Sequence, residues 1–307
     1  MSVASAPLRR PGTLAVWWQA VRPFSLVVAA VPGVVGTAAL FAAHRSRPLV
    51  ALGCIVLAAL LLAGTNSLND AEDAATGADD TDTAMPSLSL RQGWIDPAGA
   101  RRVAVACFAA AALLGVALVV SLHKPGLLAL GAAALLVGWA YTAPPLRLAY
   151  RPLGELASGL PIGLGVTWGT AAAQTDTIPA SVWWSGATLA LLTAAVLHAN
   201  NARDRGHDRA VGKRTLATYL PRGVIVLEYR LLTAGIIPVV VLGVATHGLP
   251  WPCLIALLPG AMALRAALAV SVTTDGRGWT MALIAAVKLV TLTGVCLTLG
   301  LVVSRFI

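Results

Sequence analysis

Charged residues are scarce in this chain of 307 residues: they make up 11% of it, and only 13 residues are acidic. A water-soluble domain usually has about a quarter charged residues, so this scarcity excludes an ordinary soluble enzyme. Apolar residues instead make up 58% of the chain, and the mean hydropathy is +0.80. Because a bilayer crossing takes roughly 20 apolar residues, the composition predicts an all-α, polytopic membrane protein.

Cysteine pairs are also missing, since the four cysteines stand singly in apolar segments without metal-site spacing. We expect each of them to be a small buried apolar side chain. No cleavable signal peptide is apparent, because the first long apolar run begins at Phe24 and is itself long enough to span. The net charge of +9 comes from cations scattered between apolar runs, so we expect no nucleic-acid binding.

Nine apolar runs are long enough to cross a bilayer, and Pro, Gly or charged residues bound them. They lie at 24–43, 49–68, 99–121, 126–142, 154–174, 180–200, 223–246, 249–273 and 279–304. Continuous apolarity without alternation favours helices over barrel strands. We therefore predict one domain over residues 1–307. It would comprise an N-terminal interfacial segment at 1–23, a nine-helix bundle at 24–304, and polar loops at 69–98, 143–153 and 201–222.

Lys and Arg are unequally distributed between the two predicted membrane sides. If the N-terminus is cytoplasmic, the outer segments contain only Arg45, Arg47, Lys124 and Arg305, and most other cations lie inside. The positive-inside rule then predicts a cytoplasmic N-terminus in the inner (cytoplasmic) membrane, with all three polar loops on the cytoplasmic side.

Most carboxylates follow either the second or the sixth apolar run. The first Asp row is Asn66, Asp70 and Asp73, and the second Asp row is Asn200, Asp204 and Asp208. If each helix continues past its apolar run, the members of a row share one helix face. Four spans separate the rows, so both must lie on the same membrane side. This repeat indicates two pseudo-symmetric halves around a central apolar cavity.

The Asp rows offer only oxygen ligands, and carboxylate with amide oxygen is a donor set that suits Mg²⁺. Carboxylates at the C-terminal end of a helix are unfavourable with respect to its dipole, so cationic partners are expected. Candidate cations on the same side are Arg22, Arg147, Arg151, Lys213 and Arg214. Mg²⁺ sites and cations at an apolar bundle together indicate a diphosphate joined to a hydrocarbon tail.

Longer strings surround these residues. They are Asn69-Asp70-x-x-Asp73-x-x-x-Gly77, Tyr141-Thr142, Tyr150-Arg151-x-Leu153-Gly154-Glu155 and Asn200-Asn201-x-Arg203-Asp204-x-x-x-Asp208-x-x-x-Gly212-Lys213-Arg214. Through these strings the chain resembles the UbiA superfamily of intramembrane prenyltransferases. The resemblance extends over essentially the whole length of the chain. Within this superfamily, the strings are most similar to the 1,4-dihydroxy-2-naphthoate polyprenyltransferases of menaquinone synthesis. The chain departs from that branch at Ala71 and Thr76, where an aromatic residue and a Lys are usual, which leaves the acceptor less well defined than the reaction.

The resemblance implies Mg²⁺-dependent transfer of a prenyl group from an isoprenyl diphosphate to an aromatic acceptor within the lipid bilayer, with 1,4-dihydroxy-2-naphthoate as the expected acceptor. It implies that each Asp row holds one Mg²⁺, with Asp70, Asp73, Asp204 and Asp208 as the catalytic carboxylates. The residues implied to contact the diphosphate are Arg22, Asn66, Tyr141, Arg147, Asn200, Lys213 and Arg214. Glu155 and His198 are candidate bases on the acceptor side. No obligatory protein partner is indicated.

Several alternatives stay open on the sequence alone. Glu155 can instead pair with Arg151 at i, i+4, and His198 can simply form a hydrogen bond within the bundle. Asp79 can lie close to the metal site or be solvated like Asp80 and Asp82. Lys288 lies in the middle of the ninth run, where it can pair with a carboxylate, reach the interface or contact substrate.

Two other functions fit parts of the pattern. A terpene cyclase on the same scaffold would keep both Asp rows and ignore aromatic acceptors. A secondary transporter would also use paired polar sites in a repeated bundle, although such sites usually lie near the middle of the membrane.

Overall fold

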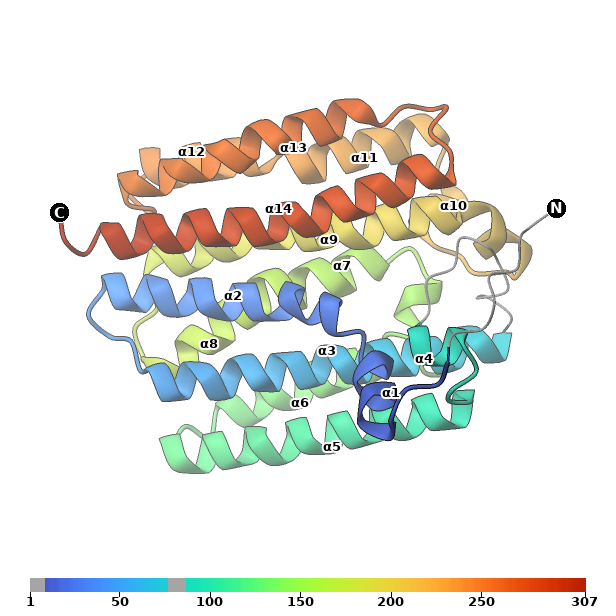
Figure 1. Cartoon of the computed structure of the whole chain (residues 1–307). Helices are drawn as coiled ribbons and strands as arrows, with labels where there is room; N and C mark the ends of the chain where they lie inside the picture. Colours follow the sequence, from blue (N-terminus) through green and yellow to red (C-terminus); the bar gives the residue numbers. More distant parts are fainter. Residues whose placement is uncertain (1–8, 77–86) are drawn as a thin grey trace.

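Long apolar segments can satisfy their backbone in lipid only as helices or closed barrels, and this chain forms helices. The computed structural model describes residues 9–76 and 87–307, and that part of the chain contains no strand. Its long helices lie roughly along one common direction (Figure 1). The C-terminus lies at one end of this bundle.

Seven helical segments in the described part of the chain are long and apolar enough to cross a membrane. They are α2 (Pro23–Ala42), α3 (Pro48–Thr76), α5 (Pro97–Leu122), α9 (Ala180–Ala210), α11 (Arg222–Ala234) with α12 (Ile236–Ala245), the 3₁₀ turn Trp251–Ala256 with α13 (Leu257–Ala269), and α14 (Gly276–Val303). The all-helical membrane architecture predicted from the composition is therefore confirmed.

The apolar runs at 126–142 and 154–174 form shorter helices. The first is α6 (Leu127–Ala140), with 14 residues. The second is divided into α7 (Gly154–Gly159), a π-helical turn at Leu160–Gly165, and α8 (Val166–Gln174). This turn contains Pro161, which lacks a backbone N–H, and Gly163. A Cβ at Gly163 would lie 2.2 Å from the backbone nitrogen of Ala190, so the lack of a side chain at Gly163 lets α9 approach closely.

Both helices that carry the Asp rows continue past their apolar runs. Helix α3 ends at Thr76 and α9 at Ala210, so parts of the loops predicted at 69–98 and 201–222 are helical. The ends of these helices lie at the same end of the bundle as α1 (Thr13–Ala20), α4 (Leu88–Arg91) and α10 (Leu216–Tyr219) (Figure 1). Because each helix continues through its row, the members of a row share one helix face.

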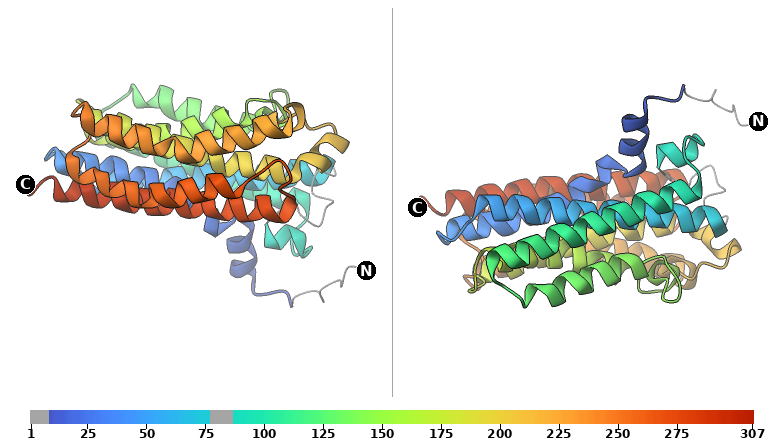
Figure 2. Two further views of the ribbon diagram at one scale, coloured as in Figure 1. Left: turned by 90° about the horizontal axis from the view of Figure 1, so that it is seen from above. Right: turned by 90° about the horizontal axis from the view of Figure 1, so that it is seen from below.

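Helix α1 projects from the side of the bundle (Figure 2). It packs on α4, where the Ser89 hydroxyl donates a hydrogen bond of 2.5 Å to the carbonyl oxygen of Val16. Leu14, Trp17 and Trp18 on α1 are exposed. Exposed Trp and Leu beside a helical bundle are typical of a segment that lies in the membrane interface.

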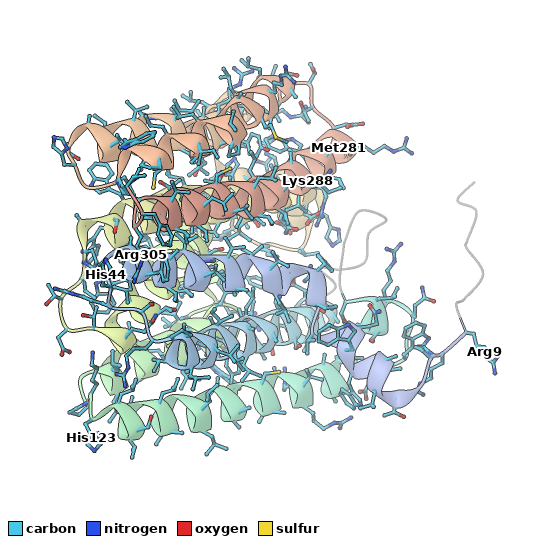
Figure 3. All side chains as sticks on the ribbon, turned by 60° about the vertical axis from the view of Figure 1, so that its left-hand side comes forward. Arg9, His44, His123, Met281, Lys288 and Arg305 are labelled. Carbon is cyan, nitrogen blue, oxygen red and sulfur yellow. The ribbon has the colours of Figure 1, made fainter. Side chains whose placement is uncertain are left out.

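Small residues hold the bundle together at its tightest helix contacts. A Cβ at Gly294 of α14 would lie 2.1 Å from Val31 of α2, and one at Gly36 would lie 2.4 Å from the carbonyl oxygen of Thr167. Close approach at small residues replaces the hydrophobic effect as the source of packing between helices in lipid. The end of the bundle opposite Arg9 carries His44, His123 and Arg305 (Figure 3).

Candidate active site

A cavity of about 970 Å³ lies inside the bundle. Most of its wall is apolar and comes from residues such as Leu57, Leu61, Leu135, Ile162 and Val287. Both Asp rows also line it, and they lie toward the C-terminal ends of α3 and α9. The cavity therefore joins a polar site to a long apolar chamber, which suits a ligand with an anionic head and a hydrocarbon tail.

Asp70, in the first Asp row, is buried and held by groups from distant parts of the chain. Its Oδ1 lies 3.2 Å from Nη1 of Arg22, and its Oδ2 accepts a hydrogen bond of 2.8 Å from the backbone N–H of Ser87. Arg22 precedes α2 with a positive φ of 54°, a conformation that is uncommon for a residue other than glycine. Asn66 donates from its side-chain nitrogen to Oγ of Ser25 at 2.9 Å.

Asp73 is held by side chains from its own helix and from later parts of the chain. The hydroxyl of Tyr150 donates to its Oδ1 at 2.6 Å, and the side-chain nitrogen of Asn69 donates to its Oδ2 at 2.7 Å. Nζ of Lys213 lies 3.5 Å from the same Oδ2. A carboxylate that accepts several charge-assisted hydrogen bonds is fixed in orientation.

The second Asp row is held mainly from within its own helix. Arg203 donates from Nε and Nη2 to the two carboxylate oxygens of Asp204, at 2.8 and 2.6 Å. Its Nη2 also lies 3.0 Å from the amide oxygen of Asn200. One turn further along, Oδ2 of the buried Asp208 has no hydrogen-bond partner among the described residues.

Lys213 connects the two rows. Its Nζ lies 3.5 Å from Asp73 and 3.8 Å from Asp208. The chain reaches this position because Gly212, just after α9, takes a positive φ of 77°, which costs glycine little. The same Nζ lies 5.1 Å from the centre of the Tyr150 ring. Two carboxylates from helices far apart in the sequence thus meet at one cation, on one side of the bundle.

Arg147 and Arg214 stand apart from the other predicted diphosphate contacts, because neither lines the cavity. Nη2 of Arg147 lies 3.4 Å from Glu72, and its guanidinium covers the Tyr150 ring at 5.4 Å. Arg214 is exposed, and its backbone N–H donates to the carbonyl oxygen of Tyr150. Tyr141 does line the cavity, as do Arg22, Asn66 and Asn200.

Glu155 and His198 form a buried cluster behind the cavity wall. Nε2 of His198 lies 2.8 Å from the carbonyl oxygen of Ile225, and Nδ1 lies 3.6 Å from Glu155 and also from Glu228. Neither Glu155 nor His198 lines the cavity, but Asn201 does, and its side-chain nitrogen donates to Glu155 at 3.0 Å. Arg151 does not pair with Glu155 and instead donates to the carbonyl oxygen of Pro145.

The structure adds residues that the sequence analysis quoted but gave no role. Tyr150, Asn69 and Arg203 hold the carboxylates of the rows, and Asn201 links the Glu155 cluster to the cavity. Their occurrence inside the motif strings was the available signal, and it did not indicate which side chains they contact. Asp79, Asp80 and Asp82 lie outside the described residues.

Comparisons with known proteins agree with this geometry. The UbiA prenyltransferase family matches residues 29–292 of the chain. The chain is 33% identical over 271 residues to the 1,4-dihydroxy-2-naphthoate octaprenyltransferase of Mycobacterium tuberculosis. The aligned region covers 86% of this chain and 89% of the relative.

Solved structures share the fold. A UbiA homologue from Aeropyrum pernix has a TM-score of 0.66 at 17% identity, covering 90% of this chain and 97% of that one. A homologue from Archaeoglobus fulgidus, bound to GPP and Mg²⁺, has a TM-score of 0.61 at 13% identity, covering 92% and 99%. The chain therefore belongs to the UbiA prenyltransferase family. It is a multi-pass membrane prenyltransferase, as its sequence motifs predicted.

Proposed function

We propose that this enzyme transfers a prenyl group from an isoprenyl diphosphate to an aromatic acceptor in a Mg²⁺-dependent reaction, with 1,4-dihydroxy-2-naphthoate as the acceptor. The observation that carries the proposal is the meeting of the two Asp rows at Lys213, at the polar end of an apolar cavity. The curated relative from Mycobacterium tuberculosis is named for the same acceptor, and the Archaeoglobus homologue is described as bound to a prenyl diphosphate with Mg²⁺.

The donor set at this site fits Mg²⁺. The rows supply carboxylate and amide oxygens and no sulfur or imidazole, and Oδ2 of Asp208 is buried without a partner among the described residues. Mg²⁺ uses one or two protein carboxylates and fills its other positions with phosphate oxygens and water. Asn66, Asp70 and Asp73 would hold one ion, and Asn200, Asp204 and Asp208 the other. Bound Mg²⁺ would supply Lewis-acid stabilisation of the diphosphate.

The protein's own groups perform the remaining tasks in this proposal. When the allylic C–O bond of the donor breaks, negative charge develops on the diphosphate, and Arg22 and Lys213 stabilise it. Tyr141 contributes a hydroxyl at the same site. Arg147 and Arg214 act indirectly, by supporting Tyr150 and the loop that carries Lys213. The apolar wall excludes water, which would otherwise quench the allylic cation.

An electron-rich carbon of the acceptor ring then forms the new C–C bond. The ring releases a proton, or carbon dioxide where the attacked carbon bears the carboxyl group, and diphosphate leaves. Glu155 and His198 do not line the cavity, so we propose that they position Asn201, which does. Asn201 in turn presents its amide group to the acceptor side of the chamber.

We further propose a single domain of nine crossings, in which α6 and the α7–α8 segment complete the seven longer spans. The helical positions of all nine apolar runs support this arrangement. The parallel roles of the rows on α3 and α9 support two pseudo-symmetric halves. The Lys and Arg distribution supports a cytoplasmic N-terminus in the inner membrane and a site that opens to the cytoplasm.

A labelled-donor experiment tests the function. Proteoliposomes containing the purified full-length enzyme are incubated with radiolabelled prenyl diphosphate, with and without Mg²⁺ and with and without 1,4-dihydroxy-2-naphthoate. We expect prenylated aromatic product only when both are present, and none from the Asp70→Asn variant. Labelled cyclic hydrocarbon formed without the aromatic compound would instead identify a terpene cyclase. Uptake of intact donor without diphosphate release would identify a transporter.

A further inference from the structure

Lys288 is an ionisable residue near the middle of α14 (Figure 3), and it lines the same cavity as the Asp rows. A cation among apolar side chains in a membrane is costly unless it meets water or an anion. Lys288 forms no hydrogen bond or ion pair with any residue that the structure describes. The cavity-lining cations Arg22, Arg203 and Lys213, by contrast, each contact a carboxylate.

Lys288 cannot reach the membrane surface along its own helix. At a rise of 1.5 Å per residue, it lies about 18 Å from Gly276 and about 22 Å from Val303, the ends of α14. A four-carbon side chain spans neither distance. Its neighbours on the cavity wall of α14, Ile284 and Val287 among them, are apolar. Lys288 is exposed in the structure and lines the cavity, so an anion bound inside the cavity can reach it.

The position of Lys288 along the bundle relates it to the first Asp row. The next residues, Leu289 and Val290, share a buried apolar cluster with Val28 of α2. Val28 lies about one turn after Ser25, whose hydroxyl oxygen accepts the hydrogen bond from Asn66. Lys288 thus lies on the apolar wall where α14 packs against α2, and it makes no ion pair with the carboxylates that hold Arg22 and Lys213.

Resting on the proposed function, we propose that Nζ of Lys288 binds the carboxylate of the aromatic acceptor. An acceptor such as 1,4-dihydroxy-2-naphthoate carries this group beside its ring hydroxyls. An ion pair in an apolar wall is little screened by water, so it would both hold the ring and select acidic acceptors over neutral ones. The diphosphate is bound separately, by the cations at the Asp rows.

Equilibrium binding of two acceptors tests this assignment. Full-length enzyme in nanodiscs of uncharged lipid is titrated with 1,4-dihydroxy-2-naphthoate and with 1,4-dihydroxynaphthalene, which lacks the carboxylate. We expect Lys288→Met to weaken binding of the naphthoate by about ten- to a hundredfold, as loss of a charged hydrogen bond implies. Binding of 1,4-dihydroxynaphthalene should not change, and Lys288→Arg should restore most of the naphthoate affinity. Arg265→Met, which removes another exposed intramembrane cation that does not line the cavity, should bind both acceptors normally.

Three results would overturn the assignment. One is that Lys288→Met binds each acceptor as tightly as the unaltered enzyme does. Another is that Lys288→Met loses affinity for both acceptors by the same factor. The third is weaker binding of prenyl diphosphate with unchanged binding of the naphthoate, which would make Lys288 a donor contact. If the unaltered enzyme prenylates the naphthoate, these results affect Lys288 alone. If the unaltered enzyme neither binds nor prenylates an aromatic compound, the proposed function fails as well.

Discussion

The two Asp rows have the same residue types at similar helical spacing, yet the protein holds them in different ways. Asp70 and Asp73 on α3 contact Arg22, Ser87, Tyr150 and Lys213, which come from other parts of the chain. Asp204 on α9 is instead bound by Arg203, its neighbour in sequence. The first row is therefore held by tertiary contacts, whereas the second is held mainly by contacts within its own helix.

This difference indicates separate purposes for the cations. Arg22 ties the start of α2 to α3, so it contributes to the assembly of the bundle as well as to the site. Among the described residues, Arg203 bonds to Asn200 and Asp204, both on its own helix α9. Lys213 contacts one carboxylate of each row and so connects the two rows. Both rows should be needed for chemistry, but only the first should be needed for stability.

The largest effect is expected from removing one carboxylate charge in either row. Asp73→Asn and Asp208→Asn should each lower the rate of diphosphate release by about 10³-fold, because each removes a preorganised charge at the site. Initial rates over a range of Mg²⁺ concentrations measure this loss. Asp176→Asn, which changes an exposed carboxylate paired with Lys124, is the matched control and should keep full activity. Near-normal rates in one row's variant would mean that the rows are not equivalent in chemistry.

A smaller effect on stability should distinguish the rows. Arg22→Met leaves the buried Asp70 without its cation, so we expect the free energy of unfolding to fall by about 3 kcal/mol. Arg203→Met should lower it by only about 1 kcal/mol, since Asp204 stays partly hydrated and no two helices are separated. Thermal unfolding of both variants in the same detergent measures the difference. Equal losses would contradict the local character of the second row.

The smallest effects concern the groups around Tyr150. Tyr150→Phe removes the hydrogen bond to Asp73 but keeps the ring, and kcat should fall about tenfold. Arg147→Ala should change kcat and the KM for the donor by less than about threefold. Its side chain is 36% exposed and pairs with the buried Glu72 outside the cavity, and Glu72 would keep its ion pair with Arg101. A large rise in the KM for the donor in Arg147→Ala would instead indicate that Arg147 contacts the diphosphate directly, as the sequence motifs suggested.

Much of this site could be predicted because it depends on local spacing. Residues three or four apart on a continuous helix share a face, which suffices to group Asp70 with Asp73 and Asp204 with Asp208. The four apolar runs that lead from the first row to the second predict that both rows lie on one side. Partners such as Tyr150 and Ser87 could not be predicted, because no periodicity connects them to Asp73 or Asp70.

The positions of Glu155 and His198 also could not be predicted from the sequence. Their residue types suggested bases that contact the acceptor, but neither lines the cavity. Helices α7, α9 and α11 pack so that His198 lies beside Glu155 and Glu228, and Glu155 accepts a hydrogen bond from Asn201. Likewise the run at 154–174 is predicted as one continuous crossing, and only the structure shows the π-helical turn at Leu160–Gly165, where Gly163 lies against the backbone of Ala190.

The sequence by itself determined the membrane helices, the two carboxylate rows and the chemistry they suit, because hydropathy and helical periodicity act between residues that are close along the chain. Only the tertiary structure decided which cations meet those carboxylates and which polar groups reach the cavity. Those contacts depend on how the sides of separate helices fit together, and the close approach of backbones at Gly36, Gly163 and Gly294 sets that fit.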